Sequence, residues 1–390
     1  MPNPEICIVV CTYQRPGNLR RSLASIAGQR DVAGKMEIVV ADDGSQDETR
    51  EVFEQFRASV DFPVRFATHP HAGFCPGRCR NEGVAASQAE YLLLLDGDCM
   101  IPPYHVRIHL DRRRRGIVRI GDCLRLDEAP SARITAEMAF SGAYQPLAPW
   151  NQRAKMLRKA CKASWYNWRG HPFKPRLTSN NVGLWRDDYI RINGFDESYV
   201  GWGCEDDDFG MRLRRCGLRL ESILWWTRPY HLWHPTDPSM PARWHQGANV
   251  NYLKRGFHLL RCGNGLEKRS PRDLRLQYVG AAPRGDLIGR VLPAGCHLTP
   301  YDSARPAEVE VLFAPSARGF SGRADCNLLV VPEPHLEFAP QYSAANVVVS
   351  AVPWATFSSE HQFALDEFAA ALHYLLYNAR PMAGQRLRAA

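Results

Sequence analysis

The chain has 390 residues, a length that suits two domains or one large domain with an appendage. Its hydrophobic and charged fractions of 45% and 23% exclude a wholly disordered protein, and no apolar run reaches the about eighteen residues of a membrane-spanning helix. The formal net charge of +8 favours an anionic partner, such as a phosphate, a nucleotide or a membrane surface.

The N-terminal sequence MPNPEICIVV lacks the basic start of a signal peptide, so we expect a cytoplasmic protein whose twelve cysteines are reduced. Cys75 and Cys79 have no second pair at zinc-ligand spacing, which disfavours a zinc site. The basic cluster Asp111–Gly116 is typical of a solvated helix end, with a lipid or phosphate patch as the alternative. We find no recognised nucleic-acid module and no aromatic-interleaved basic stripe, and therefore expect no nucleic-acid partner.

The first hundred residues alternate between apolar strand-like runs and amphipathic helical segments. The helix at 45–56 opens with a predicted capping box of Ser45 and Glu48. This order predicts an α/β fold with a mostly parallel sheet and right-handed crossovers. The expected strands are 6–13, 36–45, 64–69 and 89–99, and the expected helices cover 19–26, 45–56 and 77–87.

Polar residues stand where three of these strands end. Parallel sheets bind ligands at the carboxyl ends of their strands, so this edge is the predicted site. The sequence has neither the Gly-rich dinucleotide fingerprint nor a GxxxxGK[ST] phosphate loop. The strand-end residues are Thr12 and Tyr13, then Asp42 and Asp43, and finally Asp96 and Asp98.

The second half of the chain is less regular. The long, irregular segment 102–176 indicates an insertion or an acceptor-binding region, and 180–199 predicts a short strand, a helix and a turn. From about Gly263 the Pro, Gly and Arg content rises, and EVEVLFAP, CNLLVVPEP and ANVVVSAVPW read as strands before a closing amphipathic helix with Phe363 and Phe368 inward. The predicted domains are 1–262, with halves of about 1–100 and 101–262, and a smaller α/β domain at 263–390.

Two acidic motifs carry the predicted chemistry. Asp96-Gly97-Asp98 places two carboxylates on one side of an extended segment, an arrangement that suits Mn²⁺ or Mg²⁺ bound together with substrate phosphates. The second motif, GWGCEDDDFG at 201–210, sets four acids behind Gly-Trp-Gly, which indicates a sugar pocket as well as a helix start.

In this order and spacing, VVCTYQRP, VVADDGSQDET, CRNEGVAAS and LLLLDGDC resemble family 2 glycosyltransferases of the GT-A fold. The segment from Asn180 to Asp208 is similar to the acceptor-side motif of β-1,4-galactosyltransferases and chondroitin-polymerase domains. The resemblance covers roughly residues 5–240 and implies a metal-dependent, inverting transfer of a sugar from a UDP-sugar to a glycan or lipid-linked acceptor.

The resemblance also implies a role for each matching residue. Asp206 is the general base, and Glu205 contacts the donor sugar. Trp202, Gly203 and Asp207 belong to the acceptor and sugar pocket. Asp98 binds the metal with His231, although His234 lies only three residues on and the sequence does not separate the two. The residues expected at the nucleotide are Thr12, Tyr13, Arg15, Asp43, Arg80 and Asp96.

Bacterial surface polysaccharide, such as lipopolysaccharide, O-antigen or capsule, is the pathway that the resemblance favours. That pathway would place the protein in the cytoplasm, in peripheral contact with the inner membrane. Two alternatives stay open. A nucleotidyltransferase is disfavoured by the single glycine in CTYQRPGN, and a non-catalytic carbohydrate-binding protein of the same fold would be expected to lose Asp98 or Asp206.

Overall fold

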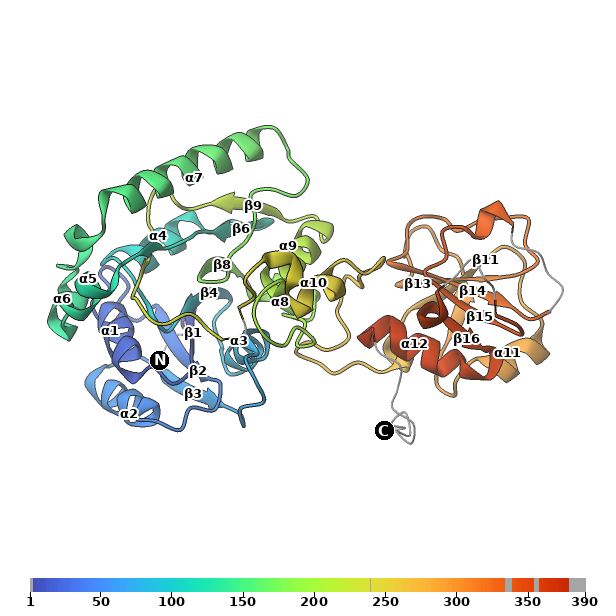
Figure 1. The fold of residues 1–390 in the computed structure, drawn as a ribbon, viewed down its shortest axis with the longest axis horizontal. Coiled ribbons are helices and arrows are strands. Elements are labelled where there is room, and N and C mark those ends of the chain that lie inside the picture. Colours follow the sequence, from blue (N-terminus) through green and yellow to red (C-terminus); the bar gives the residue numbers. More distant parts are fainter. Residues whose placement is uncertain (1–2, 239, 334–338, 354–357, 379–390) are drawn as a thin grey trace. The chain divides into compact units, whose positions relative to one another are not determined.

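The computed structural model describes residues 3–238, 240–333, 339–353 and 358–378 (Figure 1). The chain divides into two compact units, Met1–Leu253 and Lys254–Ala390. Each unit is an α/β layer structure with its own sheet, so the expected α/β fold with a smaller second domain is confirmed. No helix in the described part of the chain combines the length and apolar character needed to span a bilayer.

The sheet of the first unit contains seven strands. Its first four strands in spatial order run parallel, and β8 enters antiparallel to both β4 and β6. In spatial order the strands are β3 Val64–Thr68, β2 Met36–Asp42, β1 Ile6–Thr12, β4 Tyr91–Asp96, β8 Asn181–Trp185, β6 Ile117–Ile120 and β9 Arg219–Ser222.

A second, three-stranded sheet lies in the same unit, with β10 Tyr230–His231 between β5 Cys99–Met100 and β7 Leu124–Arg125. The helices of the unit surround both sheets. They are α1 Pro16–Ala27, α2 Thr49–Ser59, α3 Pro76–Ala85, α4 His105–Arg112, α5 Glu128–Ala132, α6 Ala136–Ser141, α7 Trp150–Trp168, α8 Arg186–Arg191, α9 Glu205–Arg215 and α10 Ala248–Leu253, with 3₁₀ turns at Gln145–Leu147 and Trp244–Gln246.

Apolar periodicity explains the first layer. Alternate residues of β1, Ile6, Ile8 and Val10, are fully buried and share one core with Leu19 and Leu23 of α1. Because β1 is covered on both faces, its sequence is a continuous apolar run rather than an alternating one. This core holds the central strands in register and so fixes where their polar ends lie.

Two local expectations were wrong. The predicted capping box does not form, because α2 begins only at Thr49 and the Ser45 hydroxyl instead accepts a hydrogen bond from the Gln14 amide at 2.8 Å. Residues 102–176 are largely helical and not irregular. Their longest helix, α7, buries Met156, Ala160 and Ala163 at helical spacing, a stripe too small in side-chain volume to stand out in the sequence.

The second unit has a six-stranded, fully parallel sheet. Phe363 lies in strand β16 and not in the closing helix, whose Phe368, Leu372 and Leu375 are buried as expected. Pro334 and Trp354, at the ends of two quoted strand segments, lie outside the described residues. In spatial order the strands are β12 Leu298–Pro300, β11 Leu276–Val279, β13 Val309–Phe313, β14 Cys326–Val331, β15 Val347–Ser350 and β16 Gln362–Ala364.

The helices of this unit are α11 Gly285–Val291 and α12 Phe368–Tyr377, with 3₁₀ turns at Pro271–Asp273, Pro340–Tyr342, Ser359–His361 and Leu365–Glu367.

Candidate active site

The carboxyl ends of the central strands of the first unit meet at one edge of the sheet. The register pairs Thr12 with Asp42, Cys11 with Asp96, and Asp42 with Thr68. Gly97 lies so close to β1 that an added Cβ would stand 2.9 Å from the Cys11 carbonyl oxygen, which explains the glycine between the two aspartates. The strand-end residues singled out in the sequence are therefore neighbours in space.

Asp43 belongs to a buried polar cluster at this edge. Its Oδ1 lies 2.7 Å from Nε2 of His69, whose Nδ1 lies 2.7 Å from Glu82 on α3. His71 stacks on the Tyr13 ring with centroids 4.2 Å apart, and its Nδ1 lies 3.3 Å from Oδ2 of Asp43. An aromatic face thus stands beside a carboxylate, a combination that can bind a nucleobase.

Asp98 lies at the centre of a second cluster. Its carboxylate is 3.1 Å from Nε2 of His234, 3.5 Å from Nε2 of His231 and 3.4 Å from Arg15. The antiparallel pairing of β10 with β5 sets His231 opposite Cys99 and so brings it to Asp98. The expected Asp98–His231 pairing is matched by the geometry, and His234 lies equally within reach.

Opposing effects act on the titration of this cluster. Burial raises the pKa of Asp98, but the hydrogen bond to His234 and the charges of His231 and Arg15 bring it down to about 2. Burial also lowers the pKa of His231, while the hydrogen bond to Asp98 raises the pKa of His234. One ligand atom from each of the three side chains lies within 4.8 Å of the others, so this nitrogen-and-carboxylate set fits a divalent cation.

Arg80 connects the strand-end acids with the acidic run. The side chain is buried on α3, where it hydrogen bonds Asp96 at 3.0 Å and approaches Glu205 at 3.9 Å. Its guanidinium also lies over the Phe195 ring, 5.2 Å from the centroid. The two motifs, more than a hundred residues apart in the sequence, therefore form one site.

The acidic run begins helix α9 after a tight turn. Gly201, Gly203 and Cys204 all have positive φ, of 83°, 93° and 75°, so Cys204 holds a conformation that favours glycine. Asn249 fixes this turn by donating to the Gly201 and Gly203 carbonyl oxygens at 3.2 and 2.9 Å. Trp202 lies half-buried within the turn.

Glu205 and Asp206 are carboxylates with unused oxygens. Asp206 accepts a hydrogen bond from the Ser179 amide at 3.1 Å, while its Oδ1 and the Oε2 of Glu205 are buried without a partner in the described part of the protein. Burial raises the pKa of both groups, and the charge of Asp206 adds to the rise for Glu205, whose pKa lies near 8. Neighbouring carboxyl groups whose pKa values are raised by burial are typical of ligand sites.

The last two acids of the run differ from these. Asp207 is partly exposed and 3.7 Å from Arg176, and burial raises its pKa. Asp208 is fully buried and paired with Arg212 at 2.7 Å, and Arg212 also donates to the Ile192 and Gly194 carbonyl oxygens. Asp208 therefore holds α9 in place rather than facing a ligand.

A cleft of about 540 Å³ opens beside this site. Its walls include Tyr13 and Arg15 after β1 and the segment from Trp233 to Pro238. His234 and Arg15 line the cleft and also contact Asp98, so a molecule bound there would have access to the cation set.

Several site residues were missed in the sequence. His69 and His71 follow the end of β3, so the rule that polar residues at strand ends mark the site applies to them as it does to Asp43 and Asp96. Ser179 and Arg176 carry no comparable signal, because they precede β8 in a segment without regular structure. Asn249 lies on α10 and reaches the site turn only through tertiary packing.

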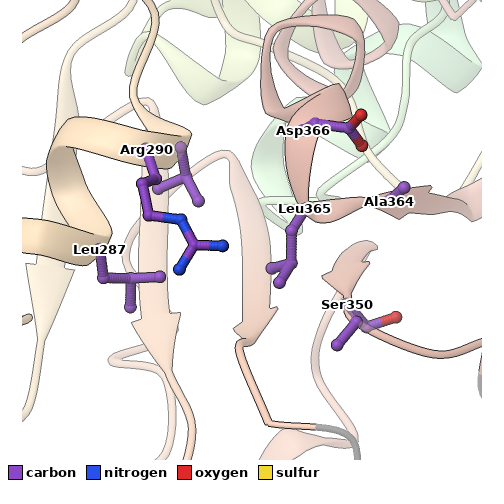
Figure 2. Close-up of a pocket in the computed structure, with 8 residues that line it drawn as sticks. Leu287, Arg290, Ser350, Ala364, Leu365 and Asp366 are labelled. Atoms are coloured by element: carbon purple, nitrogen blue, oxygen red, sulfur yellow. The ribbon is translucent and has the colours of Figure 1, made fainter.

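The second unit has a smaller cavity of about 370 Å³ at the carboxyl ends of β15 and β16 (Figure 2). Arg290 of α11 and Asp366 border it, with Ser350 and Leu365 on the other sides. Its lining contains no histidine and one carboxylate, in contrast to the site in the first unit.

Comparison with known proteins agrees with this geometry. Residues 7–116 match the family model described as glycosyl transferase family 2, and residues 161–235 match that described as the N-terminal domain of galactosyltransferase. These two ranges contain the strand-end residues, the acidic run and both histidines. The first unit therefore carries matches to two glycosyltransferase family models, on an α/β fold of the GT-A type.

Among individual proteins, the chain is 28% identical over 225 residues to validoxylamine A glucosyltransferase of Streptomyces hygroscopicus subsp. jinggangensis (strain 5008), covering 55% of this chain and 52% of the relative. It is 25% identical over 232 residues to chondroitin synthase of Escherichia coli, covering 56% and 33%. The chain thus spans about half or less of the length of these curated relatives.

Solved structures show a more distant likeness. TarS 1–349 of S. aureus has a TM-score of 0.41 at 16% identity, covering 58% of this chain and 60% of that one. The mannosyltransferase PcManGT of Pyrobaculum calidifontis, in complex with GDP-Man and Mn²⁺, has a TM-score of 0.42 at 14% identity, covering 59% and 57%.

Proposed function

We propose that the protein is a metal-dependent, inverting glycosyltransferase that moves a sugar from a UDP-sugar to a hydroxyl of a glycan or lipid-linked acceptor. The observation that carries the proposal is the position of Arg80, which joins Asp96 at the strand ends to Glu205 in the acidic run. A site that only bound a nucleotide would not need the second motif, and a site that only bound a glycan would not need the first.

The nucleotide end is assigned to the cluster after β1, β2 and β3. The Tyr13–His71 stack supplies an aromatic surface, and the Asp43 carboxylate beside it can accept a hydrogen bond from the imide N–H of uracil. Arg15 and Arg80 supply positive charge for the diphosphate, consistent with their contacts to Asp98 and Asp96.

Asp98, His231 and His234 are the side chains that would hold Mn²⁺ or Mg²⁺. When bound, the cation neutralises charge on the leaving diphosphate. The three ligand atoms converge as such a set requires, which supports both histidines rather than one as candidate ligands.

Asp206 is the proposed general base. It takes the proton of the acceptor hydroxyl while that oxygen forms a bond to the anomeric carbon, and the bond from this carbon to the diphosphate oxygen breaks with its electron pair going to UDP. A single displacement of this kind inverts the anomeric centre. The Ser179 amide holds Oδ2 of Asp206 and leaves Oδ1 available for the hydroxyl.

Glu205 has the complementary role at the donor sugar. Its raised pKa keeps a large fraction of the group protonated at neutral pH, so it can donate a hydrogen bond to a sugar oxygen. Trp202 and Asp207 are assigned to the acceptor on the other side of the turn. Production of a surface polysaccharide in the cytoplasm is the proposed context, supported by relatives such as the chondroitin synthase of Escherichia coli.

The first experiment is a thermal-shift screen of the purified protein with UDP-, GDP-, CMP- and dTDP-sugars, each with Mn²⁺, Mg²⁺ or EDTA. A bound donor stabilises the native state by mass action, so one UDP-sugar should raise the unfolding midpoint in a metal-dependent way. Asp98→Ala should remove the metal dependence. A rise that is unchanged by EDTA and by Asp98→Ala would contradict the metal assignment, and no rise with any UDP-sugar would contradict the donor class.

A non-catalytic carbohydrate-binding protein is the alternative. This alternative would be favoured if a UDP-sugar raised the unfolding midpoint but no UDP was released when acceptor fractions from a polysaccharide-producing cell were added.

A further inference from the structure

Helix α7 has a surface that the proposed catalytic site does not use. The helix packs against β9 and β7 through Met156, Ala160 and Ala163, and Asn167 donates to the Leu220 carbonyl oxygen at 2.9 Å. Figure 1 shows α7 as a long helix beside β9, at the outside of the first unit. Its opposite side is open to solvent.

This open side carries large apolar groups. Trp150 and Trp168, at the two ends of the helix, are 80% and 79% exposed, and Leu157 and Trp165 between them are 49% and 50% exposed. Trp150, Leu157 and Trp168 are seven and eleven residues apart, close to whole helical turns, so they form one stripe along the helix. Isolated exposed tryptophans are ordinary, but a stripe of them along one helix indicates a contact surface.

The same side is strongly basic. The 19 residues of α7 include no Asp or Glu. Arg158 is exposed beside Trp165, about 80° round the helix from Trp150, and Lys162 and Lys155 are exposed farther round in the same direction. Arg169 follows with its guanidinium 5.3 Å from the Trp165 ring centroid. Lys159, by contrast, pairs with Asp122 and belongs to the fold.

The basic cluster at 112–115, which stood out in the sequence, is different. Arg113 pairs with Glu5, Arg115 pairs with Asp187 and lies 3.8 Å from the Trp185 ring centroid, and Arg112 lies 4.1 Å from that of Trp226. Most of its charge is thus engaged inside the unit. Lys155, Arg158 and Lys162 of α7, by contrast, take part in none of the ion pairs found among the described residues, so their charge is available to a partner.

We propose that α7 docks the protein on the surface of an anionic lipid bilayer. Trp and Leu side chains enter the boundary between headgroups and acyl chains, while Arg158 and Lys162 at the edge of this stripe approach the lipid phosphates, as in interfacial amphipathic helices. The helix lies along the surface, because its buried side stays packed on β7 and β9. This docking does not depend on the proposed transfer reaction.

Two other partners fit less well. Self-association through this face would bring the basic side chains of two copies together without opposite charge on α7 to pair with them. Nucleic acid could pair with the basic side chains. The tryptophans at the two helix ends, however, are better suited to a membrane interface, where the ring lies between the apolar chains and the polar headgroups.

The position of α7 connects the docking surface with the acceptor side of the site. Arg176, whose Nε lies 3.7 Å from Asp207, follows Trp168 by eight residues, a chain length that spans at most about 28 Å. A membrane bound at α7 is therefore within reach of a lipid-linked acceptor that enters the site.

The test is co-sedimentation of the full chain with phosphatidylcholine vesicles, with and without phosphatidylglycerol. The wild type should pellet only with anionic vesicles and be released by salt. The double variants Trp150→Ala/Trp168→Ala and Arg158→Glu/Lys162→Glu should each lower the partition coefficient by about tenfold or more. For the charge variant, this follows because each basic side chain near an anionic surface strengthens binding by about fivefold. Both pairs are exposed, so circular dichroism and the unfolding midpoint should stay unchanged.

Arg112→Glu/Arg114→Glu is the matched control, with the same charge change elsewhere in the unit, and should leave the partition coefficient within about threefold of wild type. Equal losses for the control and the α7 variants, or no anionic-lipid dependence at all, would overturn the proposal. The proposal would also be overturned if the α7 variants still bound vesicles but were monomers in light scattering where the wild type is a dimer. The same holds if the variants still bound vesicles and lost affinity only for a mixed-sequence RNA. Turnover of a UDP-sugar without vesicles is a separate readout, so either proposal can fail alone.

Discussion

Helix α9 has two acidic sides with opposite environments. On the site side, Glu205 is buried and Asp206 half-buried, and Arg80 approaches Glu205 no closer than 3.9 Å. On the packed side, Asp208 is fully buried and held by Arg212 at 2.7 Å, and Arg212 also donates to two backbone carbonyl oxygens of the preceding loop. Asp206 and Asp208 are two residues apart, about 200° round the helix, and therefore face opposite sides.

This difference shows how a ligand site can be distinguished from a structural ion pair. Burying a charge without a partner is unfavourable, so evolution of a stable fold would favour the Asp208 arrangement everywhere. Burial raises the pKa of Glu205 and Asp206, an unfavourable effect that a ligand in contact with both groups would offset. Four predictions test this interpretation.

Asp206→Asn should have the largest effect. The amide keeps the shape and the hydrogen bond from the Ser179 amide but cannot accept a proton, so transfer should fall by about 10²–10⁴-fold. UDP-sugar binding, measured by the thermal shift, should be retained. Transfer near the wild-type rate would remove Asp206 from the proposed role, and lost donor binding would place it at the nucleotide instead.

Asp208→Ala should mainly affect stability. Leaving the Arg212 guanidinium buried without its carboxylate should cost about 3–5 kcal/mol of the free energy of unfolding. Asp207→Ala, one residue away and paired only with an exposed arginine, is the control and should cost less than about 1 kcal/mol. Denaturant titration measures both, and equal losses would mean that the two sides of α9 do not differ as described.

The pH dependence of kcat/KM and of stability should also distinguish Asp206 from Asp208. Burial raises the pKa of Asp206, so kcat/KM should fall on the acidic side at a pH above the ordinary aspartate value of 3.8. The stability effect has the opposite direction. A carboxyl group whose pKa is raised by folding destabilises the native state once pH exceeds its unfolded pKa, and the effect is absent below it.

Asp206→Asn should therefore raise the unfolding midpoint at neutral pH and leave it unchanged well below pH 3.8. A midpoint lowered at neutral pH would show that the ionised carboxylate stabilises the fold, as at Asp208.

The smallest expected effect is at the two ends of α9. Gly203 and Gly217 have φ of 93° and 84°, and an added Cβ meets nothing within 4 Å at either. Alanine at each position should cost about 1–2 kcal/mol through backbone strain alone. Only Gly203→Ala should also lower transfer, because its turn carries Trp202. Equal transfer activity of the two variants would show that the turn at Gly203 does not contribute to the site.

Much of this fold followed from apolar periodicity. The four parallel strands and three helices of the first hundred residues are local patterns, and the strand-end rule placed Asp43, Asp96 and Asp98 at one edge because the register of parallel strands aligns their ends. The acidic run was also visible, but its division into site and structural acids depends on Arg80, more than a hundred residues before Glu205, and on the burial of the Asp208–Arg212 pair, which its spacing of four residues does not reveal.

The features that the sequence did not predict depend on tertiary contacts. The sequence of α7 does not indicate a packed helix, because its buried stripe is mostly alanine and its large apolar side chains are exposed to solvent. Asn249 and Ser179 act through single backbone contacts that leave no compositional trace. The role of His234 beside His231 needed coordinates, since a two-residue strand and one turn decide which imidazoles reach Asp98.

The pairing of β10 with β5 also distinguishes the two clusters of the site. The cluster around Asp43 needs only the first three parallel strands and α3, whereas the cluster around Asp98 closes through a two-residue strand separated from it by about half of the first unit. Closing a loop of this length costs conformational entropy that the Asp43 cluster does not incur. The three side chains around Asp98 are therefore brought together only by the tertiary pairing of β10 with β5, whereas the Asp43 cluster needs only residues 13–82.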